Sequence, residues 1–128
     1  MDIRLKRTYE RPTRSDGQRV LVDRLWPRDI REEEEAYIDN WMKELAPSAY
    51  LCEWFGYNPL RWAGFKRRYI RELHRNSEEV MRLAEMAESG PVTLVFAAKD
   101  GEHNNAIVLK DYLEMEFSSH AAGAFREP

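Results

Sequence analysis

Residues 17–28 read Gly-Gln-Arg-Val-Leu-Val-Asp-Arg-Leu-Trp-Pro-Arg, and this stretch decides the fold. It opens on a turn glycine and continues with an apolar run, Val20-Leu21-Val22, which ends abruptly at Asp23. A strand with one face in water would alternate apolar and polar residues, so an unbroken run predicts a buried strand. In open α/β sheets ligands sit at the carboxyl ends of such strands. The stretch therefore predicts the place of a site and no particular reaction.

A second apolar run, Val92–Ala98, predicts a second central strand. The residues between the two runs are predicted to be largely helical, and a long helical connection joins parallel strands. An alternating run that begins at Ile3 predicts a short strand with one face in water. We therefore expect an α/β fold with a small, mainly parallel sheet flanked by helices. Residues 1–117 would form a single domain, and residues 118–128 would form a flexible tail.

Helix start and stop signals are frequent in this chain. One helix is predicted to begin in the acidic run Glu32–Glu35 and to end at Pro47, with Ile38, Trp41, Met42 and Leu45 on its apolar face. The signals of the other helices are Ser48 with Gly56, then Asn58-Pro59, then Ser77 as a cap, and finally Asn104 before the last helix.

Composition and charge exclude several classes of protein. The chain has 128 residues and a net charge of −3, so it lacks the positive field of a protein that binds nucleic acid over its whole surface. No apolar run approaches the roughly 20 residues of a membrane span, and the charged N-terminus lacks the apolar region of a signal peptide. The single cysteine, Cys52, has no partner for an intrachain disulfide. We therefore expect a soluble, cytoplasmic protein that makes no membrane contact.

Asp23, Arg24, Trp26 and Arg28 follow the first central strand and form the first candidate site. Arginine guanidinium groups bind carboxylate or phosphate through two parallel hydrogen bonds. Asp23 would orient an arginine or act as a general base, and Trp26 would stack on an aromatic ring of the ligand. The alternative is structural, with an ion pair that closes the strand end and Trp26 packed as a plug.

Lys99, Asp100 and Asn104 follow the second central strand, where a polar loop leads into the N-terminus of a helix. If the two strands lie side by side and parallel, this loop and the segment after Asp23 face one crevice. Lys99 and Arg28 would then hold the same anion. The alternative is an ordinary polar loop in which Asn104 caps the helix.

A third candidate site is the basic helix at residues 59–76. Its arginines, among them Arg67, Arg68 and Arg71, lie mostly outside the apolar stripe and would contact phosphates, while aromatic edges would contact bases. The alternative is a solvated helix face that is balanced by neighbouring acidic helices.

Other sites are not predicted. The chain has no GxGxxG, P-loop or GxSxG pattern, so we predict no cofactor. The histidines and Cys52 do not have the spacing of metal ligands, so we predict no metal site. Cys52 has apolar neighbours and is predicted to be a small core residue, not a nucleophile.

Seven segments recur together as a family pattern: Asp16-Gly17, Arg19–Arg28, Trp41, Glu44–Ser48, Trp54–Gly56, Ala97–Asp100 and Asn104. Together they resemble the YeaO-like branch of the uncharacterised family called domain of unknown function 488. The resemblance implies a small α/β protein of the prokaryotic cytoplasm and implies no established activity. The branch commonly has Asn-His where this chain has Asn104-Asn105, so the resemblance does not supply a histidine base here.

The leading interpretation is a protein that binds an anionic small molecule at the strand ends, such as a nucleotide or phosphorylated metabolite. Turnover stays open, because no nucleophile motif is present. One alternative is nucleic-acid binding through the basic helix at residues 59–76. The other is a protein-interaction module that presents Trp or Tyr side chains to a partner.

Overall fold

Four parallel strands form one sheet, in the order β1-β4-β2-β3. The computed structural model describes residues 1–28 and 37–118. The strands are β1 (Ile3–Arg7), β2 (Gln18–Leu21), β3 (Asn40–Trp41) and β4 (Val92–Phe96). All three pairings are parallel, as the helical connection between the apolar runs predicted. The expected α/β fold with a small parallel sheet is confirmed.

β4 and β2 are the two inner strands, and their unbroken apolar runs are explained by cover on both faces. Val20 pairs with Leu94, and Leu21 pairs with Val95. Because side chains alternate along a strand, the first pair faces the main core and the second pair faces a smaller cluster with Ile38. All four paired side chains are fully buried. The buried polar residues of these strands, Arg19 and Thr93, are both hydrogen-bonded to Asp16, as burial of a polar group requires.

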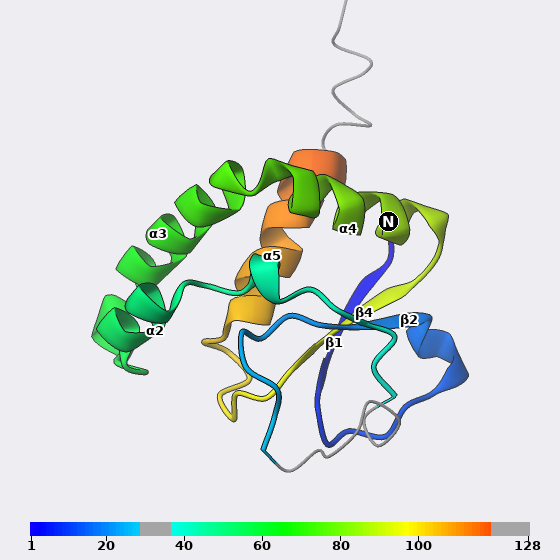
Figure 1. Cartoon of the computed structure of the whole chain (residues 1–128), viewed down its shortest axis with the longest axis horizontal. Coiled ribbons are helices and arrows are strands. Elements are labelled where there is room, and N and C mark those ends of the chain that lie inside the picture. Colours follow the sequence, from blue (N-terminus) through cyan, green and yellow to red (C-terminus); the bar gives the residue numbers. More distant parts are fainter. Residues whose placement is uncertain (29–36, 119–128) are drawn as a thin grey trace, which may run out of the picture.

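Helices supply the main core on one face of the sheet. They are α2 (Ala49–Phe55), α3 (Trp62–Arg75), α4 (Ser77–Ser89) and α5 (Asn105–Leu113). A π-helical turn, Glu114–Ser118, extends α5. In Figure 1, α3 and α4 follow one another as an arc, and α2 lies beside the start of α3. α5 contacts α3 and also the strands β1 and β4. None of the helices in the described residues is long and apolar enough to cross a membrane.

The predicted ends of α2 and the predicted start of α3 are confirmed. The Ser48 hydroxyl oxygen accepts the Leu51 N–H at 3.1 Å. Gly56 ends the helix in the left-handed region, with φ 52°, which favours glycine. The Asn58 side chain accepts the Leu60 N–H at 3.0 Å and begins a short 3-10 turn that leads into α3. Local cap chemistry therefore fixes where these two helices meet.

The helix predicted to end at Pro47 is wrong in its described part. Asn40–Trp41 is strand β3 beside β2, and Lys43–Leu45 is a 3-10 turn. The predicted start, Glu32–Glu35, lies outside the described residues. A smaller correction concerns Ser77, which is the first residue of α4 and not its cap.

The apolar spacing misled the prediction because its members pack on opposite faces of the sheet. Ile38 joins the cluster of Leu21 and Val95, whereas Met42 and Leu45 join the main core under the helices. A chain segment that crosses a sheet edge can produce a helical spacing by coincidence. Burial on two faces, not on one stripe, holds this segment in place.

A buried carboxylate ties β1 and β2 together. Asp16 is 1% exposed and lies 2.8 Å from the Lys6 ammonium and 2.7 Å from an Arg19 guanidinium nitrogen. Thr13 donates to the same carboxylate through its hydroxyl at 2.8 Å and its N–H at 3.1 Å. Burial opposes ionisation, but these hydrogen bonds outweigh it and hold the pKa of Asp16 far below its ordinary value.

Replacement of Asp16 by Asn is expected to lower the free energy of unfolding at neutral pH by about 3–5 kcal/mol, because it leaves buried cations without their counter-charge. A lowered folded-state pKa means that the contribution of Asp16 is present above about pH 4 and is lost as the pH falls further. The difference between wild type and Asp16→Asn should therefore shrink in acid. Urea unfolding at neutral and acidic pH measures it.

Asp2→Asn is the matched control, since Asp2 pairs with Arg4 at 2.9 Å on the surface. Exposed pairs contribute little, so the stability of this variant should stay close to that of wild type. An Asp16→Asn variant with the same stability loss at both pH values would contradict the role of the ionised carboxylate.

Candidate functional site

The carboxyl ends of β2 and β4 meet at the side chain of Asp23. Its Oδ2 accepts the Ala97 N–H at 2.8 Å, and its Oδ1 lies 3.3 Å from the Asn105 side-chain nitrogen. That same nitrogen donates to the Val22 carbonyl at 2.9 Å. The predicted convergence of the two strand exits is confirmed, and we call Asp23, Ala97 and Asn105 the strand-end rim. The Asp23 carboxylate thus already accepts the Ala97 N–H, which is a donor that a bound anion would use there.

The Asp23 carboxyl is buried and hydrogen-bonded within the fold, and its role as a general base stays a prediction. Burial raises the pKa of this carboxyl, and the hydrogen bonds from Ala97 and Asn105 only partly offset the effect. The backbone carbonyl of Asp23 also accepts the indole N–H of Trp41 at 2.8 Å. Every polar contact of Asp23 therefore joins it to the fold.

Trp26 packs at the same end of the sheet. Its ring meets the ring of Trp41 edge to face, with centroids 5.3 Å apart. It also packs against the small cluster of Leu21, Ile38 and Val95. These contacts fit the structural alternative for Trp26, a packed plug over the second face of the sheet.

Of the cations predicted at the strand ends, Arg24 is bonded away from the rim. The Arg24 guanidinium donates to the Pro47 carbonyl at 3.2 Å, near the start of α2. The backbone carbonyl of Lys99 accepts from Arg7, the last residue of β1, at 3.2 Å. The side chains of Arg24, Arg28 and Lys99 are exposed. Their joint hold on an anion stays a prediction.

Asp100 and Asn104 shape the loop between β4 and α5. The Asp100 carboxylate accepts the His103 N–H at 3.1 Å and lies 2.9 Å from the His103 Nδ1. Asn104 accepts the Ile107 N–H at 3.0 Å and donates to the Asp100 carbonyl at 2.9 Å. The predicted role of Asn104 as a helix cap is confirmed.

Cys52 is exposed, so its prediction as a small core residue is wrong. It lies on α2, with its sulfur 3.8 Å from the Pro47 carbonyl oxygen. Partial burial of the thiol raises its pKa, and the nearby Arg24 offsets this only in part. Because the thiolate is the reactive form, Cys52 is not an activated nucleophile.

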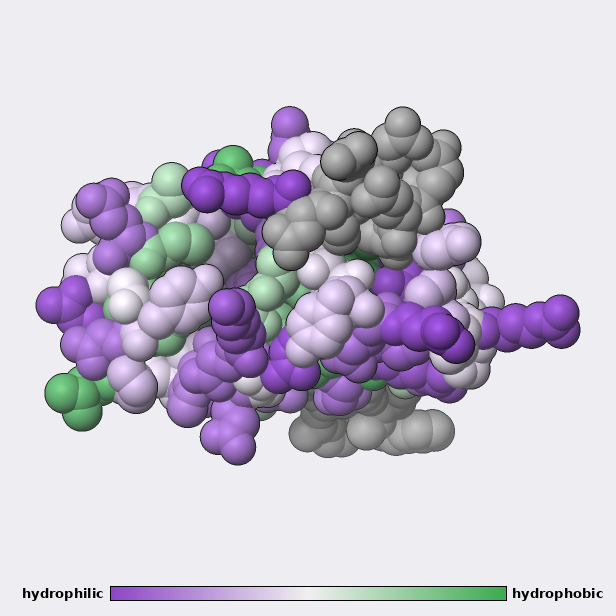
Figure 2. All heavy atoms as spheres, turned by 90° about the horizontal axis from the view of Figure 1, so that it is seen from below, coloured by the Kyte–Doolittle hydropathy of each residue, from purple (hydrophilic) through white to green (hydrophobic). Residues whose placement is uncertain are grey.

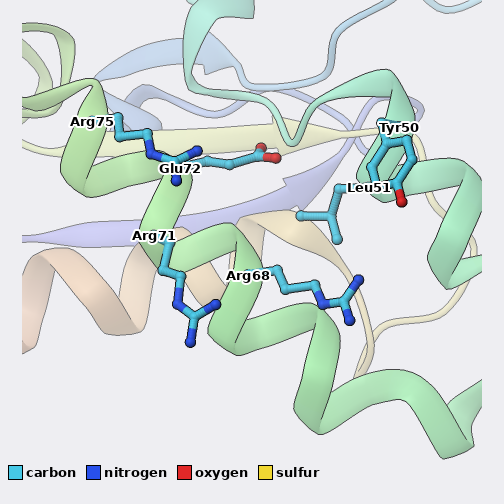
Figure 3. Close-up of a pocket in the computed structure, with 6 residues that line it drawn as sticks. All are labelled: Tyr50, Leu51, Arg68, Arg71, Glu72 and Arg75. Carbon is cyan, nitrogen blue, oxygen red and sulfur yellow. The ribbon is translucent and has the colours of Figure 1, made fainter.

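A pocket of about 310 Å³ opens between α2 and α3. Four of its lining residues belong to α3 and two to α2, and Figure 3 shows their side chains. The lining residues are Tyr50, Leu51, Arg68, Arg71, Glu72 and Arg75, and we call this the α2–α3 pocket. Within the described residues, none of its three arginines forms an ion pair.

Glu72 does not neutralise these arginines by direct pairing, because its carboxylate is engaged elsewhere. One oxygen accepts the Ser48 N–H at 2.8 Å, and the other accepts the Ser48 hydroxyl at 2.6 Å. The α2 N-terminus, where the helix dipole is positive, thus uses the one acidic side chain of the pocket. Arg68, Arg71 and Arg75 retain their hydrogen-bond donors for an outside acceptor.

The Arg68 guanidinium is held in place by an aromatic ring. It stacks over Trp54, with its central carbon 4.0 Å from the ring centroid. Arg61 approaches the same ring at 5.2 Å. A stacked guanidinium keeps its edge N–H groups free for hydrogen bonds, so the stack orients Arg68 without using its donors.

Comparison with known families decides the relationship of this chain. A family model described as "Inactive DUF488-N3 subclade" matches residues 2–127. The chain belongs to this subclade. The chain is similar to the uncharacterized protein YeaO of Escherichia coli K12, with 42% identity over 113 residues, covering 88% of this chain and 97% of YeaO. The uncharacterized proteins Mb3100c of Mycobacterium bovis and Rv3073c of Mycobacterium tuberculosis H37Rv are each 39% identical over 111 residues, 87% of this chain and 92% of theirs.

The expected YeaO-like relationship is thus confirmed. The relatives are bacterial proteins that are described only as uncharacterized. No solved structure matches this member of the DUF488-N3 subclade.

Sequence reasoning missed two parts of the site. Asn105 was noted for its departure from the family pattern, not for its bonds to Val22 and Asp23. The pairing of Glu72 with Ser48 was also missed, although a lone acidic residue in the basic face of α3 is a usable signal. Long-range partners of this kind are not encoded in local spacing.

Replacement of Asp23 by Ala is expected to lower the free energy of unfolding by about 1–3 kcal/mol, because the Ala97 N–H loses its acceptor. Asp23→Asn should lose less, since an amide oxygen can still accept. Because burial raises the Asp23 pKa, the wild type should gain stability relative to Asp23→Asn as the pH falls through that pKa. Urea unfolding at neutral and mildly acidic pH measures both effects.

Asp111→Ala, which removes an exposed carboxylate from α5, is the control for lost charge. If Asp23→Ala unfolds like Asp111→Ala, then the Asp23 carboxylate does not join the two strands.

Proposed function

We propose that this protein binds a phosphate-bearing ligand in the α2–α3 pocket and does not turn it over. The observation that carries the proposal is the set of three arginines, Arg68, Arg71 and Arg75, around one pocket without ion pairs among the described residues. Guanidinium groups match the oxygens of phosphate in geometry and charge.

The arginines share one helix face because of their spacing. Residues three and four apart lie on the same side of a helix, so positions 68, 71 and 75 project together, with 72 beside them. Three guanidinium groups outnumber the one carboxylate of Glu72, so the local field at the pocket mouth is set mainly by the cations.

Several observations support binding without catalysis. The matching subclade is described as inactive. The described residues contain no cluster of three or more histidine, cysteine or acidic residues able to hold a metal ion. The Asp23 carboxyl is tied to the fold, and the Cys52 thiol is not activated.

The strand-end rim is the other place for which the sequence predicts an anion. There the Asp23 carboxylate already accepts the Ala97 N–H and would repel a second negative group. The geometry therefore favours the α2–α3 pocket over the rim.

Arg71→Ala is expected to weaken the binding of inorganic pyrophosphate and of ATP about tenfold or more, since a hydrogen bond to a charged group contributes about 1.5–3 kcal/mol. Isothermal titration calorimetry at low salt measures the affinities. Arg71 is exposed, so the free energy of unfolding should stay close to that of wild type.

Arg67→Ala is the matched control, because it removes the same charge from the same helix at an exposed position outside the pocket. It should reduce affinity only slightly. Equal losses of affinity in the two variants would mean that binding depends on overall charge and not on the pocket, which would contradict the proposal. The proposal would also be refuted if the wild type bound neither pyrophosphate nor ATP.

A further inference from the structure

The cations that line the pocket on α3 are followed by a further arginine in the turn before this helix. Arg75, Arg71 and Arg68 line the pocket, and Arg61 lies past them against the ring of Trp54. Arg61 already donates to the Trp54 carbonyl, so the donors left for a ligand are those of Arg68, Arg71 and Arg75, which span about 10 Å of helix at 1.5 Å per residue. A row of that length exceeds what one phosphate group can contact, so it indicates a ligand with phosphates in series.

Aromatic rings are exposed beside the same row. Tyr50 lines the pocket and is 76% exposed, and Tyr57 is 69% exposed at the turn between α2 and α3. Figure 3 shows the Tyr50 ring on the α2 side of the pocket, opposite the α3 arginines. Rings next to guanidinium groups are the arrangement that binds unpaired bases beside their phosphates.

The character of this surface argues against other partners. Seen from below, the α2–α3 end of the molecule, on the left in Figure 2, carries mainly hydrophilic side chains, with hydrophobic residues in small separate patches. An apolar protein partner or a lipid surface would need a larger continuous apolar area. Along the chain the basic row ends at Arg75, and the first turn of α4 that follows is acidic, with Glu78 and Glu79.

Resting on the proposed phosphate binding, we propose that the natural ligand of the α2–α3 pocket is a single nucleic-acid strand. Its phosphates lie along Arg75, Arg71 and Arg68, and one of its bases stacks on Tyr50. Duplex is disfavoured, because paired bases cannot reach the Tyr50 ring and the chain as a whole is negative.

Fluorescence anisotropy with labelled oligothymidylate and oligouridylate of about 4 and about 12 nucleotides tests this proposal, and these lengths span the site sizes of single-strand binding folds. The longer strand should bind more tightly than the shorter one and than a mononucleotide. With three phosphate contacts, affinity should fall about 20-fold between about 50 mM and about 200 mM salt. Tight binding of either sugar type supports the proposal.

Tyr50→Ala is expected to weaken strand binding about fivefold or more, whereas Tyr50→Phe keeps the stacking ring and should bind like wild type. Arg71→Ala should weaken it about tenfold, and Arg67→Ala should change it little. Equal effects of Tyr50→Ala and Tyr50→Phe would overturn the stacking role.

Two results separate this inference from the proposed function. If pyrophosphate binds in an Arg71-dependent way but oligonucleotides bind no more tightly than a mononucleotide, the single-strand proposal fails and phosphate binding stands. If a duplex of the same length binds as tightly as the single strand, the single-strand proposal also fails. If neither pyrophosphate nor any oligonucleotide binds, both proposals fail.

Discussion

The hydrogen bond from the Ala97 N–H to the Asp23 carboxylate is the contact on which the functional account depends. It joins the exits of the two inner strands, and Asn105 ties the first turn of α5 to the same point. In an open parallel sheet this edge is the usual place for a ligand. Here the protein fills it with its own acceptor at the expense of burying a carboxyl whose pKa rises as a result.

Among the described residues, a group of cations without ion pairs also lies on α3, away from this edge. α3 carries five cationic residues and one glutamate, while the charged residues of α4, which follows it, are mainly glutamates. Glu72 turns to the N-terminus of α2 and Trp54 holds Arg68, so structural needs are met without consuming the arginine donors. The same two contacts that pack α2 against α3 also shape the pocket between them.

Much of the fold was predictable because its signals are local. The apolar runs at Val20 and Val92 predicted the inner strands, and Ser48, Asn58 and Asn104 predicted caps that the structure confirms. β3 was missed, since its neighbours pack on opposite faces of the sheet and imitate a helix. The site was harder to predict. Sequence reasoning found the strand exits and the basic helix, but not which cations are left without ion pairs, because that depends on contacts between residues far apart in the chain.

A titration of the isotope-labelled protein with inorganic pyrophosphate, followed by nuclear magnetic resonance of the backbone amides and arginine Nε–H groups, tests the central claim most directly. The account predicts that the signals of Arg68, Arg71, Arg75 and Tyr50 shift while those of Ala97 and Asn105 stay in place. Shifts centred on Ala97, Asn105 and Lys99, with α3 unchanged, would mean that the strand-end rim is open to an anion and would contradict the account.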